Sequence, residues 1–400
     1  VTKPANLTEE HTFASLKKEG GIESVVIGNF ELSNSNILST TYQQEVDLYL
    51  PDFNFTGLDW NLAGKDSHFN LKSLNITDPV LKAIMKSEVV QQSQVKEKED
   101  AVKEKSDFYD QSATFSGKIA VDEFDLKNAR VSYRHNNEKN KFTGDDKLNT
   151  LNMGVAGLVV NNTEKTFKLD DVHFATNNLI FPIDEGRYNI LVDSIYLQQK
   201  GSKLQVDNLR MKSVYPKMEF AYKHPTHKDW FDVEATRIVL SGIDIPAYFS
   251  ENKLSVYDAQ IQDVVLRNFK NKQIDVQHNL MPMIYEGIQK APVKIDVGNL
   301  DVKNFAVYYE ELAKEKTDLS VIFFTEMNGN FKGFTNIVTR PEQYITLNAD
   351  GKLMGTGYFT ATWKIPVDTA NDRFLLNAHL REFDLTELNQ LITPMTPAKV

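Results

Sequence analysis

The chain has 400 residues, 41% of them apolar and 25% charged, which is enough apolar content for a core and too much for an intrinsically disordered protein. Acidic residues outnumber basic ones by 55 to 45 and no basic stripe is present, so we expect no binding to nucleic acid. Cysteine is absent, which excludes disulfides, thiolate nucleophiles and cysteine-ligated metals. No stretch approaches the roughly 18 apolar residues of a membrane-spanning helix.

The first element predicted along the chain is a helix over residues 8–19. Thr8 is a suitable N-cap, acidic residues follow it, and Gly20 with Gly21 would end the helix. Another short helix is expected over 279–289, ahead of a later strand segment. The order of helix and then strand therefore occurs twice, which favours an internal duplication.

A further helix is predicted from residue 79, because Asp78 is a good N-cap and Pro79 suits the first helical position. Its apolar side would consist of Leu81, Ile84, Met85 and Val89. We expect it to lie across one end or lip of a sheet, either as a simple cap or as a gate, and to continue as a charged run to residue 105. Residues 79–110 would form a helical, charged insertion.

Five similar strand segments recur through the chain. They start at residues 29, 123, 208, 299 and 382, which are 94, 85, 91 and 83 residues apart. In each, two apolar residues separated by one polar residue predict a strand with one wet and one dry face. The five apolar pairs are Phe30 and Leu32, Phe124 and Leu126, Leu209 and Met211, Leu300 and Val302, and Phe383 and Leu385.

Around these segments the apolar residues follow one another at steps of two, three, two and three. Ile295, Val297, Leu300, Val302 and Phe305 are an example. A step of three would turn side chains to the other face of a strand, so this spacing requires a bulge or a sharp bend. We therefore predict an all-β, repeat-built fold: one elongated unit over 1–400 with a strongly twisted, mostly antiparallel sheet, groove-like or taco-like, and a few short helices.

Two glycine-containing segments near the end predict local geometry. Asp350 and Gly351 indicate a tight hairpin turn between two strands. Gly355 and Gly357, which no helix follows, are expected where the sheet bends or another backbone comes close.

The polar residues supply little chemistry. His224 and His227, with Asp229 and Asp232 nearby, are the best candidate metal cluster, but Pro225 lies between the histidines and no third ligand is fixed by spacing. We interpret this segment as a surface loop. No phosphate-binding loop, nucleophile elbow or zinc-protease helix occurs, so we predict no enzyme activity, no cofactor and no metal.

The ten apolar residues of the repeated segments are the candidate site, and two interpretations are open. If a second layer covers them, they are core and nothing more. If the face stays open, the repeats line an apolar trough, which is a ligand-binding feature because large exposed apolar surfaces are unfavourable.

The C-terminal residues resemble a known family. The stretch from Asp350 to Gly357, then a long strand, then Leu376 to Ile392 with its Phe383-Asp384-Leu385-Thr386 core, is similar to the C-terminal region of AsmA-like bacterial envelope proteins. There, a Gly-rich strand precedes a Phe-Asp-Leu-Thr-x-Leu-Asn segment and a further strand. The resemblance covers about fifty residues, and the missing further strand and the insertion at 79–110 are departures from the pattern.

The resemblance implies an all-β groove protein of the periplasm in a Gram-negative bacterium, associated with outer-membrane biogenesis and similar to bridge-type lipid transfer proteins. It implies phospholipid or another acyl lipid as ligand, envelope proteins as possible partners, and an inner-membrane anchor at the N-terminus; we expect this anchor and a C-terminal continuation to lie outside the present sequence. The alternative is a structural or adhesive β protein of the envelope or cell surface, with a closed core, that binds proteins or glycans.

Overall fold

The computed structural model describes residues 2–3, 6–16, 22–40, 44–62, 67–86, 117–136, 149–184, 186–223, 228–274, 284–289, 291–368, 373–396 and 398–400. The fold is all-β, with long, mostly antiparallel strands and a few short helices, as the sequence predicts. Contacts group the chain into two compact units, which are described separately. Unit 1 comprises Val1–Asn178, Ile195–Ser202 and Ile245–Asn252, and unit 2 comprises Leu179–Ser194, Lys203–Asp244 and Lys253–Val400. The single elongated unit over 1–400 stays a prediction.

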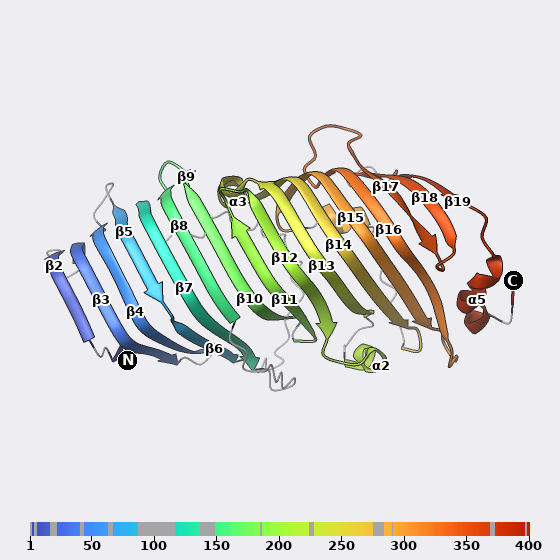
Figure 1. Ribbon diagram of the computed structural model, residues 1–400, viewed down its shortest axis with the longest axis horizontal. Coiled ribbons are helices and arrows are strands. Elements are labelled where there is room, and N and C mark those ends of the chain that lie inside the picture. The colour runs from blue at the N-terminus through green and yellow to red at the C-terminus, as the bar shows by residue number, and fades with distance from the viewer. Residues whose placement is uncertain are drawn as a thin grey trace, which may run out of the picture. The chain divides into compact units, whose positions relative to one another are not determined.

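Unit 1 contains long strands that lie side by side (Figure 1). Antiparallel pairing joins β2 to β3, β3 to β4 and β4 to β5, and also β7 to β8 and β8 to β10, whereas β5 and β6 pair with β7 in parallel. The elements are β1 (Thr2–Lys3), β2 (Asn6–Leu16), β3 (Ile22–Thr40), β4 (Gln44–Asn61), β5 (His68–Thr77), β6 (Val80–Lys86), β7 (Lys118–Asn136), β8 (Asn149–Asn161), β9 (Thr166–Lys168), the first part of β10 (Asp171–Ile183), the end of β11 (Tyr188–Gln198) and α3 (Ile245–Glu251).

Unit 2 contains the remaining parts of β10 and β11 and a second set of long strands. Pairing is antiparallel from β12 to β14, parallel between β14 and β15, and antiparallel from β15 to β19. Its elements are β12 (Lys203–Ser213), α2 (Lys217–Phe220), η2 (Ala221–Lys223), β13 (Trp230–Ile243), β14 (Lys253–Asn271), α4 (Ile284–Gln289), β15 (Lys294–Leu312), β16 (Leu319–Thr335), β17 (Tyr344–Leu353), β18 (Gly357–Pro366), β19 (Leu375–Leu380), η3 (Leu385–Leu388) and α5 (Asn389–Met395).

The bend expected inside the repeated segments is present. Asn34, Asn128 and Asn304, which close the first, second and fourth segments, have left-handed φ angles of 49°, 50° and 54°. In the third segment the first residue, Asn208, takes this conformation with φ 52°. Asparagine tolerates it better than most residues. Because the left-handed residue falls within the step of three, apolar residues on both sides of the bend keep to one face of the sheet.

Two glycines make corresponding bends in other strands. Gly57 in β4 and Gly242 in β13 have φ angles of +63° and +66°, which L side chains rarely adopt. A Cβ atom at Gly57 would lie 2.8 Å from the Cβ of Lys72, and one at Gly242 would lie 2.6 Å from the Cβ of Tyr257. Both positions therefore require glycine for conformation and for space.

Two of the predicted helices are wrong where the structure describes them. The described part of 8–19 belongs to strand β2, which pairs with β3. The supposed lid or cap helix begins as strand β6, where Leu81 lies opposite Leu48 of β4 and Val131 of β7, and Ile84 and Met85 belong to the same strand. Pairing on both sides outweighs the local capping signals. Val89 and the charged run to residue 105 lie outside the described residues.

The remaining helix prediction is confirmed in its described part, since α4 occupies Ile284–Gln289. The fifth repeated segment is wrong as a strand: Phe383 lies in an irregular stretch and Leu385 begins η3. Asp384 explains this, because its side chain accepts a hydrogen bond from the Thr386 N–H at 2.9 Å and caps the helical turn.

The hairpin turn also differs from the prediction. Asp350 and Gly351 lie within β17, opposite Thr360 and Phe359. The chain turns instead at Met354 and Gly355, whose φ angles of 49° and 78° are both left-handed, as a type I′ turn requires. Gly357 is a point of close approach, since the ring of Phe383 lies 2.5 Å from where its Cβ would be.

Candidate functional site

The apolar face of unit 1 consists of rows of side chains that lie opposite one another on successive strands. Each of two rows crosses β3, β4, β5, β7, β8 and β10 without a polar residue. The first is Phe30, Phe55, Leu74, Phe124, Val155 and Val172, and the second is Leu32, Phe53, Ile76, Leu126, Met153 and Phe174.

Aromatic rings join these two rows at one end. Phe30 stacks on Phe55 with ring centroids 4.9 Å apart, and Phe53 meets both rings edge-on at 6.2 Å and 6.1 Å. Such pairs stabilise a sheet beyond the area that they bury. These three rings therefore stabilise the pairing of β3 and β4 at this end of the apolar face.

Unit 2 carries an apolar face of the same kind. Two rows of apolar residues cross all eight strands from β12 to β19. Further apolar rows lie on the other side of the bend at Asn208 and Asn304. The first is Leu204, Leu240, Ala259, Leu300, Phe331, Leu347, Trp363 and Leu376; the second is Val206, Ile238, Ile261, Val302, Gly329, Ala349, Ala361 and Ala378; Leu209 and Met211 begin the rows beyond the bend.

These faces are only partly covered. Leu32 is buried, while Phe124, Leu126, Leu300 and Val302 are each half-buried. Among the described residues, the strands of each unit pair edge to edge within a sheet, and no second sheet covers the apolar face of that unit. The closed-core arrangement would have sealed these four side chains.

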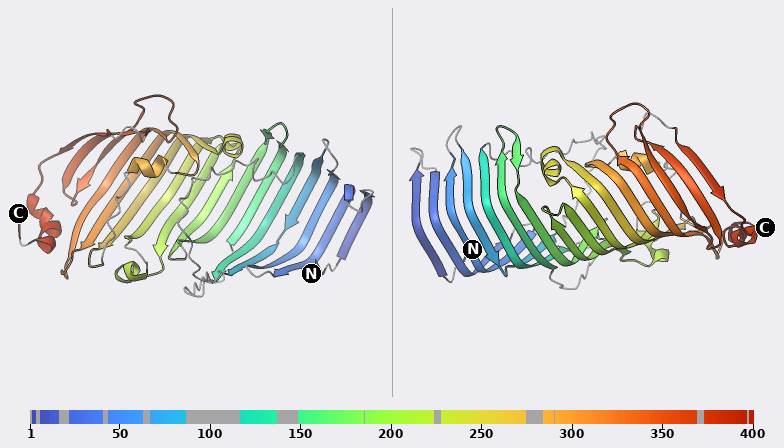
Figure 2. Two further views of the ribbon diagram at one scale, coloured as in Figure 1. Left: turned by 180° about the vertical axis from the view of Figure 1, so that it is seen from behind. Right: turned by 45° about the horizontal axis from the view of Figure 1, so that its top comes forward.

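One helix covers part of the face in unit 2. Ile288 of α4 packs on Ile345, Ile365 and Val367, each no more than 3% exposed. The left view of Figure 2 shows α4 on the side of the sheet that faces away in Figure 1. The apolar side of unit 2 is therefore the side seen from behind, and α4 shields only its border.

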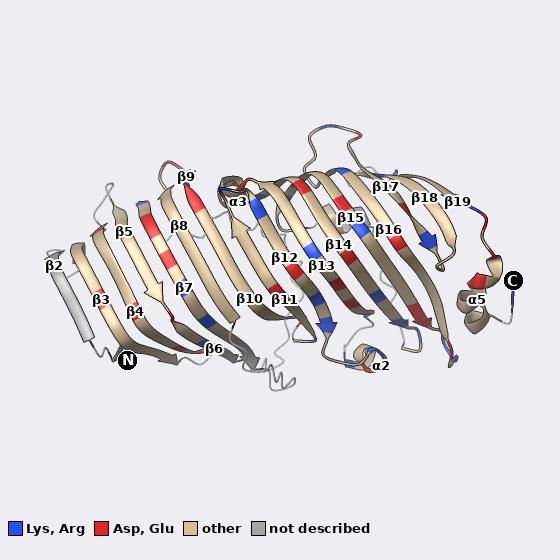
Figure 3. Cartoon of the chain, viewed as in Figure 1, with Lys and Arg blue, Asp and Glu red and all other residues tan. Residues whose placement is uncertain are grey.

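Charged residues of both signs are interspersed along the strands of each unit (Figure 3). Because consecutive side chains of a strand alternate between its faces, polar residues next to the apolar rows, such as Glu31, Asn54 and Asp125, lie on the opposite face.

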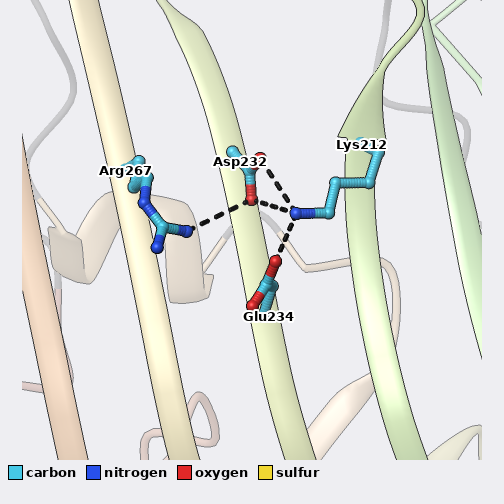
Figure 4. Close-up of polar contacts among 4 residues, drawn as sticks. All are labelled: Lys212, Asp232, Glu234 and Arg267. Carbon is cyan, nitrogen blue, oxygen red and sulfur yellow. Dashed lines mark hydrogen bonds and ion pairs between the residues drawn. The ribbon is translucent and has the colours of Figure 1, made fainter.

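In unit 2, Lys212 of β12 contacts Asp232 at 2.8 Å and Glu234, both on β13, and Arg267 of β14 approaches Asp232 at 3.8 Å (Figure 4). The hydrogen bond from Lys212 lowers the pKa of Glu234, although burial opposes it. This network binds neighbouring strands together on the side away from the apolar rows.

The structure gathers eight of the ten predicted residues into the two faces. Phe30, Leu32, Phe124 and Leu126 lie in unit 1, and Leu209, Met211, Leu300 and Val302 lie in unit 2. Phe383 and half-exposed Leu385 are in no row.

Sequence reasoning missed the apolar residues of the intervening strands, such as Phe53, Phe55 and Phe331. Their alternation with polar residues is the signal that could have found them.

No metal site is apparent in the described part of the chain. His224 and His227 lie outside it, and Asp232 is engaged by Lys212. Among the described residues, no three metal-ligating side chains come together.

The chain matches no protein-family model, and no curated protein shows significant similarity to it. In the described residues, no helix has the length and apolar character needed to cross a membrane.

Proposed function

We propose that the protein binds lipid acyl chains on the apolar rows of its sheet and shields or conducts them, without catalysing a reaction. The observation that carries the proposal is that Phe124, Leu126, Leu300 and Val302 are only half-buried in otherwise uninterrupted apolar rows. Contiguous apolar surface left in water is unfavourable, so such a face is typical of an interaction site.

Binding would follow from burial alone. Each methylene transferred from water contributes about 0.8 kcal/mol, so half of one acyl chain already gives useful affinity. A chain lying along a row meets aliphatic and aromatic side chains on successive strands about 4.8 Å apart. Phospholipid or another acyl lipid is therefore the proposed ligand, and no cofactor is part of the proposal.

The cellular setting is proposed from the resemblance of Asp350–Gly357 and Leu376–Ile392 to AsmA-like envelope proteins. On that basis the protein is of the AsmA-like type and acts in the periplasm of a Gram-negative bacterium, where it is anchored to the inner membrane and takes part in outer-membrane biogenesis. Envelope proteins are possible partners. The all-β sheet with a one-sided apolar face is consistent with that type.

The test uses two neighbouring residues of β15 that lie on opposite faces. Val302→Glu introduces a charge into the apolar rows, and Lys303→Glu introduces one on the polar face next to it. Protein purified from cells is analysed by native mass spectrometry and by uptake of a fluorescent phospholipid, with melting curves to confirm folding.

We expect bound lipid in the native protein and in Lys303→Glu, and a loss of at least tenfold in uptake by folded Val302→Glu. A lipid-free native protein that takes up no lipid would overturn the proposal. The structural or adhesive role with a closed core would then become the better explanation.

A further inference from the structure

The polar face of unit 2 has a hollow of its own, on the side opposite the apolar rows. It has a volume of about 740 Å³, within the range of small-molecule sites. Strands β15 to β19 form it, and its polar lining is mainly asparagine, threonine and aspartate, including Asp301, Asn330, Asn348, Asp350, Thr362 and Asn377.

Amide side chains in this hollow are held by hydrogen bonds. Asn330 Nδ2 donates to Asp301 Oδ1 at 2.7 Å, and Thr362 Oγ1 donates to Asn348 Oδ1 at 3.0 Å. The hydrogen bond from Asn330 lowers the pKa of Asp301, so this carboxylate remains an ionised acceptor. Because the groups stand on paired strands, their spacing is fixed before a ligand binds.

A smaller hollow of about 230 Å³ continues from the larger one. The two share Asn328, Asp350 and Tyr358. Such an extended, open shape suits a chain of linked units better than a single small molecule.

We propose that this polar hollow binds a neutral oligosaccharide. Sugar hydroxyls both donate and accept hydrogen bonds, and so do the asparagine amides and threonine hydroxyls that dominate the lining. The carboxylates of Asp301 and Asp350 accept from hydroxyls and repel anions. Lys303 is the one lysine among the described residues that line the larger hollow, Lys352 in the smaller one is paired with Glu326 at 2.7 Å, and no described arginine lines either. This balance disfavours phosphate and acidic polymers.

The hollow and the proposed lipid face use opposite sides of the same strands, and Val302, Ala349 and Ala361 of the apolar row also border the hollow. Asp301 and Lys303 flank Val302 on one strand, so their side chains point to the face opposite the apolar row. A sugar could therefore bind while the apolar face is occupied. An experiment that disproves lipid binding would leave the sugar proposal standing, and the reverse also holds.

The experiment compares two double variants of the full chain. Asn348→Ala with Asn377→Ala removes two exposed amides from the hollow. Asn54→Ala with Asn75→Ala is the control and removes two half-buried amides from the polar face of unit 1, where Asn75 Nδ2 donates to Asn54 Oδ1 at 3.1 Å. Binding is measured by ligand-observed NMR and calorimetry with maltotriose, chitotriose and inorganic phosphate.

We expect at least one of the two trisaccharides to bind, with a Kd of about 1 mM. The unit 2 variant should weaken it about tenfold or more, because two hydrogen-bonding groups are lost, and the unit 1 variant should leave it unchanged. Binding of neither sugar, binding of phosphate alone, or equal loss in both variants would each overturn the proposal. Melting curves establish that both variants are folded.

Discussion

The two units share one structural feature. In each, a pair of parallel strands bends where an aspartate on one strand and an asparagine on the other have left-handed backbone conformations. In unit 1 the bend comprises Asp78 (φ 53°) and Asn128, whose N–H donates to Asn152 Oδ1 at 2.8 Å. In unit 2 it comprises Asp263 (φ 52°) and Asn304, whose N–H donates to Asn328 Oδ1 at 3.2 Å. Both hydrogen bonds span 24 residues.

The units differ in what surrounds this shared bend. In unit 1 Pro79 divides the strand into β5 and β6, and Leu126 lies between Ile76 and Met153. In unit 2 β14 is continuous, and the row of Val302 ends in Gly329, Ala349, Ala361 and Ala378. The bent backbone is therefore the common element, while the size of the side chains on the apolar face varies between units.

The largest expected effect comes from substituting the glycines at the bends. Gly57→Ala in unit 1 and Gly242→Ala in unit 2 should each lower the free energy of unfolding by roughly 2–4 kcal/mol, because the Cβ meets a neighbouring strand and the φ angle is strained. Urea unfolding measures this.

Gly201→Ala is the control for these glycines, since its added Cβ would make only ordinary contacts, the nearest at 3.6 Å. A cost in only one unit would show that the two bends are not equivalent.

A smaller effect should distinguish the two apolar faces. Leu126→Ala is expected to lower the free energy of unfolding by about 1–2 kcal/mol. This is less than for a leucine in a closed core, because Leu126 is only half-buried. Val302→Ala should cost less than about 1 kcal/mol, because fewer atoms are removed and Gly329 is its neighbour. Equal costs from thermal unfolding would contradict the difference in packing between units.

The asparagines at the bends should each contribute about 1 kcal/mol to the free energy of unfolding. Asn128→Ala and Asn304→Ala place a less tolerant residue at positive φ, and Asn304 also loses its 2.7 Å hydrogen bond from Nδ2 to Asp263 Oδ1. The cost at Asn304 should therefore be the greater. Asn128→Gly, as the conformational control, should change stability by less than about 0.5 kcal/mol; a cost equal to that of alanine would argue against backbone strain.

The smallest effect concerns the ion pairs of the polar faces. Because Lys212 lowers the pKa of Glu234, their interaction stabilises the fold above the pKa of unfolded glutamate and is lost as the pH falls through the folded pKa. Lys212→Met should lower the free energy of unfolding by about 0.5 kcal/mol at pH 7 and by less at pH 3. The effect is small because both groups are partly exposed.

Chemical denaturation across this pH range measures the effect of Lys212→Met. The more exposed pair of Lys127 and Asp125 in unit 1 provides the comparison, and Lys127→Met should show a weaker dependence on pH. A pH-independent cost in Lys212→Met would indicate lost packing rather than lost charge interaction.

Much of the fold could be read from the sequence because it depends on local alternation. The apolar pairs from Phe30 to Val302 predicted strands with one dry face, and their steps of three predicted the bends now seen at Asn128 and Asn304. Both features follow from strand geometry, in which neighbouring side chains point to opposite faces.

Tertiary structure decided the elements whose local signals compete with strand pairing. Asp78 and Pro79 form a good helix start, yet β6 is a strand because β4 and β7 offer hydrogen bonds on both sides. Conversely, Phe383 matches the repeat but has no strand, since Asp384 caps a helical turn. The sequence by itself determined which residues share a face. Only long-range pairing determined which strands lie together and how much of that face stays uncovered, because contacts between distant strands carry no local pattern.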